Sequence, residues 1–441
     1  MGETDLRRAI RLPHATALVV GTIIGASIFV QPSEITGQTP SISAVLLVWL
    51  LSGVLTLFGA LVCAELASIY SRSGGVYVYL KESFGPAVGF LWGWAMFWTM
   101  HSGIIAAIAV IFARYVGYFA PLGDGGTKGV AIGAILILSF INYLGVEHGS
   151  FVQMLFTAGK LLAVVLIVGL GFFFGAGLPE HFVQPASRAP VMLGSFTLAL
   201  MAGLFAFGGW HMVTYSAEET VDPKRTIPRA LILGTIIVTG CYIALNTVYF
   251  YILPLDTVAS STRVAADAAN AVLGFGGGIL MSGLVIFSTF GALNGIILAG
   301  PRVYYSMAQD GLVFGWMGEV HSRYRTPHRS IAVQAVWSSV LVATGTYRAL
   351  FTRVVYTEWI FFGMMAIGLF VLRRRSDVER DYSIWGYPWV PGLFIFSSFA
   401  IVTSHVVSNP KESLTGLSLV AVGLPVYYLW TPRVKRKETT S

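Results

Sequence analysis

The chain has 441 residues, of which 55% are hydrophobic and only 11% carry a charge. A soluble domain has about 25% charged residues, so this composition excludes a water-soluble globule and predicts an integral membrane protein. The only two cysteines, Cys63 and Cys241, lie in apolar stretches, and the eight histidines are scattered. That pattern favours buried thiols over a disulfide or a metal site. We therefore expect no metal and no cofactor.

Twelve apolar segments predict twelve membrane spans, because about 20 apolar residues cross a bilayer. The segments cover residues 13–31, 43–70, 86–115, 129–147, 150–175, 193–215, 228–252, 275–305, 330–347, 352–372, 390–407 and 414–431. Twenty of the 28 basic residues then fall on one side and seven on the other, with Lys160 inside span 5. This bias predicts a multi-pass protein of the plasma (inner) membrane with both termini cytoplasmic. It also explains the net charge of +7 without a nucleic-acid partner.

The first span contains a stretch that is poor in helix formers, residues 21–27 (GTIIGAS). Two glycines, two β-branched isoleucines and two hydroxyl residues weaken the helix at mid-membrane depth, which predicts a break there. A broken helix is tolerated in a bilayer only where protein or a cavity supplies partners for its backbone. Gly21 and Gly25 also fit a small-xxx-small pattern of close helix packing, which requires no break.

A second irregular stretch, residues 205–210 (FAFGGW), interrupts span 6. Spans 1 and 6 are five apart, an odd number, so they cross the membrane in opposite directions. Paired interruptions at corresponding positions are typical of a transporter built from inverted repeats, with its binding site between them. The predicted organisation is a cytoplasmic segment 1–12, a first five-helix repeat 13–176, an inverted second repeat 193–373, two further spans over 390–431, and a cytoplasmic segment 432–441.

The two breaks suggest the chemistry of the ligand. The outer half of span 1 would point the amides of about Ala26, Ser27 and Ile28 into the cavity, where free N–H groups suit a carboxylate. Free carbonyls near residues 20–23 and around Phe205, Ala206 and Gly208 would hold a cation opposite. A carboxylate beside an ammonium describes an α-amino acid.

The chain resembles the amino acid–polyamine–organocation (APC) superfamily, specifically its L-amino acid transporter (LAT) family of permeases and exchangers. The resemblance is carried by residues 21–30 (GTIIGASIFV) with Pro32, 64–66 (AEL), 73–77 (SGGVY), 142–146 (NYLGV), 153–160, 203–210 (GLFAFGGW) with Glu218 and Glu219, Asn294, Arg302, 310–311, 372–375 (LRRR) and 385–388 (WGYP). It implies an all-α, twelve-span, LeuT-type 5+5 fold with broken spans 1 and 6. It also implies a carboxylate site at Gly25, Ala26, Ser27 and Ile28, an amine site at Thr22, Ile23, Phe205, Ala206 and Gly208, and Phe205 as a gate.

Lys160 lies about 15 Å deep in span 5, at the depth of both breaks. A lysine at the bilayer centre costs about 2.5–3.5 kcal/mol on insertion scales, and this one is too deep to snorkel. In related sodium-driven carriers a sodium ion bridges the span 1 break, and we expect the Lys160 ammonium to replace that ion. His101, Trp210 and Asn294 are candidates for the pocket wall, although a satisfied core histidine is the alternative for His101. Glu358, which is predicted near the outer end of span 10, would argue against a neutral substrate if it faced the pocket.

The sequence therefore predicts a sodium-independent transporter of neutral L-amino acids, working as an exchanger by alternating access. Its alternatives are a cationic amino acid, polyamine or proton-coupled permease of the same superfamily and, from another class, a membrane-embedded enzyme. No catalytic constellation supports the enzyme, and no continuous polar stripe supports a channel. Eukaryotic members of the resembling family bind a heavy chain through a cysteine in the outer loop after span 3. Residues 117–128 contain no cysteine, so we expect no disulfide-linked heavy chain.

Overall fold

The computed structural model describes residues 10–25, 27–39, 41–72, 74–144, 159, 162, 164–169, 171–173, 179–182, 192–324, 326–375 and 380–429. Within these ranges there are helices and turns but no strand, apart from one isolated bridge between Ile10 and Thr220. Among the described residues, eight helices are long and apolar enough to cross a membrane, and shorter apolar helices accompany them. The protein is thus an all-α polytopic membrane protein. Predicted span 5 lies mostly outside the described residues, so the count of twelve stays a prediction.

The first half of the chain contains two interruptions of its helices. Its elements are α1 (Leu12–Ile23), the 3₁₀ turn η1 (Ser27–Phe29), α2 (Gln31–Thr36), α3 (Ile42–Ile69), α4 (Val76–Phe84), α5 (Pro86–Ala95), the π-helical turn η2 (Met96–Met100), α6 (His101–Val116) and α7 (Asp124–Leu144). The predicted break in span 1 is confirmed, because α1 ends at Ile23 and helical structure resumes only at Ser27. The π turn η2 joins α5 and α6 into one span, Pro86–Val116.

The second half repeats the pattern of a broken helix followed by long ones. Its elements are η3 (Pro179–Phe182), α9 (Leu193–Ala206), the 3₁₀ helix η4 (Trp210–Glu219), α10 (Pro223–Ile252), α11 (Leu255–Ser260), α12 (Val264–Leu273), α13 (Phe275–Gln309), η5 (Gly315–Gly318), α14 (His328–Thr344), α15 (Tyr347–Arg373), α16 (Trp389–Ser408) and α17 (Pro410–Ala421). The break in span 6 is confirmed between Ala206 and Trp210, where Gly209 adopts φ +94°. Glycine takes this left-handed conformation without the cost that a Cβ imposes.

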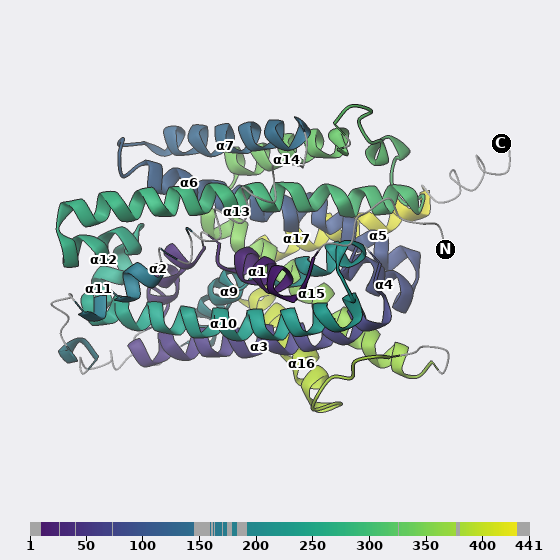
Figure 1. The fold of residues 1–441 in the computed structure, drawn as a ribbon, viewed down its shortest axis with the longest axis horizontal. Helices are drawn as coiled ribbons and strands as arrows, with labels where there is room; N and C mark the ends of the chain where they lie inside the picture. Colours follow the sequence, from purple (N-terminus) through teal and green to yellow (C-terminus); the bar gives the residue numbers. More distant parts are fainter. Residues whose placement is uncertain are drawn as a thin grey trace.

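The broken helix α1 lies in the middle of the bundle (Figure 1). It packs against α10, which in turn packs along α3, and it also contacts α13 and η4. Helix α13 packs against α6, while α7 and α14 lie side by side along one flank of the bundle. Both breaks are therefore surrounded by other helices, as backbone interrupted inside a membrane requires.

Segments predicted to lie on one side of the membrane meet at one end of the bundle. At the predicted inner end, Glu65 at the end of α3 pairs with Arg373 at the end of α15, and Lys81 of α4 pairs with Asp310 after α13. At the opposite end, α2 contacts α11, and the chain continues from α12 into α13 (Figure 1). The alternating direction of the spans agrees with these contacts, whereas the division into two repeats stays a prediction.

Candidate functional site

A buried cavity lies between the two helix breaks. It is small and is lined by Thr22, Ile23, Gly25, Ser27, Ile104, Ile108, Phe205, Gly208, Gly209, Met212, Ile296, Val354 and Glu358. Six of these residues belong to the predicted binding set: Thr22, Ile23, Gly25, Ser27, Phe205 and Gly208. The structure thus brings together segments that are about 180 residues apart in the sequence. Such a cavity at the midplane between broken helices is where carriers of this architecture hold their substrate.

The span 1 break has a tight inner half and a short outer half. The amide of Ile24 donates to the carbonyl of Val20 at 2.8 Å, and the amide of Gly25 turns back to the carbonyl of Ile23 at 2.6 Å. Ser27 begins a three-residue 3₁₀ turn, and α2 then adds only six residues. The helical structure that follows the break is therefore short, and the assignment of the carboxylate to its amides stays a prediction. Any anion here would meet individual N–H groups more than a helix dipole, which needs a longer run of aligned peptides.

Thr22 and Gly209 join the two breaks directly. The Thr22 hydroxyl donates to carbonyls of its own helix, with Leu18 at 2.8 Å, and lies 3.3 Å from the carbonyl oxygen of Gly209. A Cβ atom at Gly209 would lie 3.2 Å from the Thr22 carbonyl oxygen. Gly209 thus permits the left-handed turn and also the close approach of the two backbones.

Tyr242 of α10 is a residue of the site that the sequence did not reveal. Its hydroxyl lies 2.8 Å from the carbonyl oxygen of Ile23 and 2.9 Å from that of Ala206. A hydroxyl has one proton, so only one of the two carbonyls can accept it at a time. Both carbonyls were predicted to bind an amine, and Tyr242 therefore shares them with any ligand. A lone tyrosine in an apolar span has no spacing pattern that would have marked it.

Five predicted site residues do not line the cavity. His101 bonds through Nε2 to the carbonyl of Ile296 at 2.7 Å, which makes it a satisfied core histidine. Asn294 accepts from Asn142 at 2.7 Å, and Trp210 packs on Phe362 with ring centroids 5.0 Å apart. Their polar or aromatic groups contact neighbouring helices instead. The other two, Ile28 and Ala206, are buried beside the breaks but outside the cavity wall.

Ala26 and Lys160, two further predicted site residues, lie outside the described residues. Their roles therefore stay predictions.

Apolar side chains that the sequence did not single out form most of the cavity wall. They are Ile104, Ile108, Met212, Ile296 and Val354, and each is at most 7% exposed. Because every span is rich in such residues, composition offers no signal for which of them face a ligand. The wall that they form would contact the nonpolar part of a bound molecule.

Glu358 lies in the cavity wall, at mid-depth in α15 and only 6% exposed. Its predicted place near the outer end of span 10 is wrong, because α15 begins at Tyr347, five residues before the expected start. Thr346 caps the helix by accepting from the amide of Ala349 at 3.3 Å. Arg348 falls between predicted spans 9 and 10, yet a basic side chain can belong to a helix end that reaches the membrane surface.

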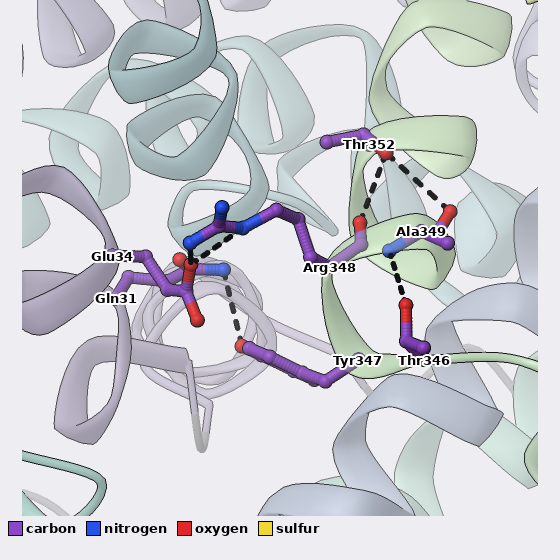
Figure 2. Close-up of polar contacts among 7 residues, drawn as sticks. All are labelled: Gln31, Glu34, Thr346, Tyr347, Arg348, Ala349 and Thr352. Atoms are coloured by element: carbon purple, nitrogen blue, oxygen red, sulfur yellow. Dashed lines mark hydrogen bonds and ion pairs between the residues drawn. The ribbon is translucent and has the colours of Figure 1, made fainter. Parts of the chain in front are cut away.

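On the predicted outer side, α2 and the start of α15 are joined by polar contacts (Figure 2). Gln31 donates to the Tyr347 hydroxyl at 3.1 Å, and Arg348 donates twice to one carboxylate oxygen of Glu34, at 3.1 and 2.7 Å. The Tyr347 ring packs on Phe351, and Phe351 packs on Phe205, with ring centroids 5.4 and 5.7 Å apart. A continuous column of side chains therefore closes the cavity from this side.

On the predicted inner side, one ion pair is deeply buried. Arg373 donates to both oxygens of Glu65, at 2.8 and 2.6 Å, and the amide of Ile384 donates to Glu65 at 2.7 Å. The Glu65 side chain is fully buried and that of Arg373 is 14% exposed. This network joins the inner ends of α3 and α15.

A buried midplane cavity between two interrupted helices, with polar contacts between helices at both ends, defines a membrane carrier. A family model described as amino acid permease matches residues 10–428. The chain is 33% identical to the serine/threonine exchanger SteT of Bacillus subtilis (strain 168), covering 97% of each chain. It is 32% identical to the human b(0,+)-type amino acid transporter 1, covering 97% of this chain and 88% of the relative, and 31% identical to the rat large neutral amino acids transporter small subunit 2, covering 97% and 81%. The chain belongs to the amino acid permease family of the APC superfamily.

Proposed function

We propose that this protein exchanges neutral L-amino acids across the plasma (inner) membrane by alternating access, without sodium and with both termini cytoplasmic. The observation that carries the proposal is the cavity lined by both helix breaks. Exchange is favoured by the similarity to SteT, which is itself named an exchanger. The basic residues gathered on the predicted inner side support the orientation.

In this proposal the two ends of the amino acid bind to the two breaks. Gly25 and Ser27 line the cavity beside Ala26 and Ile28, so amides of this segment would receive the carboxylate. The ammonium would bind carbonyls of Ile23 and of the span 6 break, each of which has two lone pairs and can accept beside Tyr242. Phe205 would act as the gate, since it lies between the cavity and the outer column of aromatic rings.

Sodium independence rests on Lys160, whose ammonium would supply the fixed positive charge beside the span 1 break. The test is the initial rate of labelled alanine exchange in proteoliposomes, measured with external sodium and then with sodium replaced by choline. We expect nearly equal rates. A tenfold or larger drop in choline, equal to about 1.4 kcal/mol of coupling, would show that sodium takes part.

We further propose that the protein acts without a disulfide-linked heavy chain and carries out no catalysis. Cys63 is buried in α3, and Cys241 lies within α10, so neither is in the outer loop after α6. Among the described residues, no three histidine, cysteine or acidic side chains are grouped for a metal ion.

A further inference from the structure

Glu358 is the one carboxyl group in the described wall of the cavity, and none of the described residues pairs with it. None of the six ion pairs of the described residues includes it, and no described residue donates a hydrogen bond to it. Its side chain is 6% exposed. A buried carboxylate without a counter-charge costs several kcal/mol, so a group kept in this state needs a reason.

The other buried glutamate of the described chain shows what a structural role looks like here. Glu65 is 0% exposed and receives two hydrogen bonds from Arg373 and one from the amide of Ile384. Glu358 receives no comparable hydrogen bonds from the described residues.

The place of Glu358 in the cavity fits a contact with the substrate side chain. Phe351, Val354 and Glu358 follow each other on one face of α15, at spacings of three and four residues. Phe351 packs on the gate residue Phe205, and Glu358 lies about 10 Å further along the helix. The wall between them is aliphatic, with Ile104 and Val354 as members, which suits a chain of methylene groups.

We propose that Glu358 binds the cationic end of a basic substrate side chain, so that this carrier takes lysine and arginine as well as neutral amino acids. The inference rests on the proposed function, because the two helix breaks would already hold the α-carboxylate and the α-ammonium. The remaining positive charge would then lie at the far end of the side chain. It would supply the counter-charge that Glu358 lacks among the described residues. From the sequence alone, cationic substrates are less favoured than neutral ones, because Lys160 and no acidic group is expected at the midplane.

The test compares pairs of inhibitors that differ chiefly in charge: lysine with norleucine, and arginine with citrulline. Each inhibits exchange of labelled alanine in proteoliposomes of the wild type, of Glu358→Gln, and of Glu34→Gln as a control outside the cavity. We expect lysine to inhibit the wild type within tenfold of norleucine. Glu358→Gln should lower the lysine-to-norleucine affinity ratio by about 30-fold or more, since removing one partner of a buried charge pair has effects of this size. Glu34→Gln should keep the wild-type ratio.

The proposal is overturned if norleucine inhibits the wild type and lysine does not, or if Glu358→Gln keeps the wild-type ratio. Should Glu358→Gln be inactive, Glu358→Asp replaces it: this variant keeps the charge and should still be inhibited by lysine within tenfold of norleucine, and failure to do so counts against the proposal. Cadaverine, which is lysine without its carboxylate, should inhibit weakly. A wild type that exchanges no amino acid at all would instead refute the proposed function.

Discussion

Two ion pairs at opposite ends of the bundle differ in how deeply they are buried. At the inner end the Glu65–Arg373 pair is 0% and 14% exposed, whereas at the outer end the Glu34–Arg348 pair is 17% and 52% exposed. A buried pair loses several kcal/mol when one partner is removed, while a pair in water contributes about 0–1 kcal/mol. The inner pair is therefore suited to holding α3 and α15 together throughout the cycle, and the outer pair to breaking in every cycle.

The largest expected effect is the loss of the inner pair. Arg373→Ala would leave the Glu65 carboxylate buried, with the amide of Ile384 as its one remaining partner among the described residues, at a cost of about 3–5 kcal/mol. We expect a clear fall in the thermal unfolding midpoint of the purified protein in detergent. Arg329→Ala is the matched control, because its pair with Glu319 is 46% and 50% exposed. Equal midpoints for the two variants would remove the proposed difference between buried and exposed pairs.

The contacts at the two ends of the bundle could not have been derived from the sequence alone. The breaks were predictable, since clustered glycines weaken a helix wherever they occur, and the break positions near Gly25 and Gly208 followed from that. Contacts across the bundle were not predictable, because the partner of a polar residue in a span depends on which helix lies beside it. Asn294 was expected in the pocket for this reason, yet it bonds to Asn142. Glu358 was predicted too close to the outer end of its span because the expected start of that span was too late. The start of α15 depends on the cap at Thr346 and on the pair between Arg348 and Glu34, two residues that lie far apart in the sequence.

The next effect concerns the buried part of the outer contacts. Tyr347→Phe removes only the hydroxyl that accepts from Gln31, and it keeps a ring beneath the Arg114 guanidinium, now 4.5 Å from the Tyr347 centroid. The Gln31 amide would lose this partner. Because Gln31 is fully buried, the loss should destabilise the outward-closed state, in which the cavity is closed toward the outside, by about 1–3 kcal/mol.

A double-mutant cycle separates this hydrogen bond from packing. Replacing both partners, with Gln31→Leu and Tyr347→Phe together, should cost less than the sum of the two single changes, since no buried polar group is then left unpaired. The readout is the labelling rate of a cysteine at position 108 in the cavity wall by a membrane-impermeant reagent, in a parent without Cys63 and Cys241. Additive effects would mean that the bond does not stabilise the closed outer side.

The smallest effect is expected for the loss of the exposed pair between Arg348 and Glu34. Its dependence on salt concentration distinguishes this pair from the buried contacts. Arg348→Ala removes both donors to Glu34 and should destabilise the outward-closed state by at most about 1 kcal/mol, or roughly fivefold in the labelling rate at position 108. Because exposed charges are screened within about 10 Å at 0.1 M salt, raising the salt to 1 M should speed labelling of the parent and leave the variant nearly unchanged. Arg353→Ala is the control, since Arg353 lies on the same helix and forms no ion pair among the described residues. If Arg348→Ala instead slowed labelling, or lowered the unfolding midpoint as far as Arg373→Ala, the outer pair would be a fixed part of the scaffold, and opening toward the outside would have to occur elsewhere than between α2 and α15.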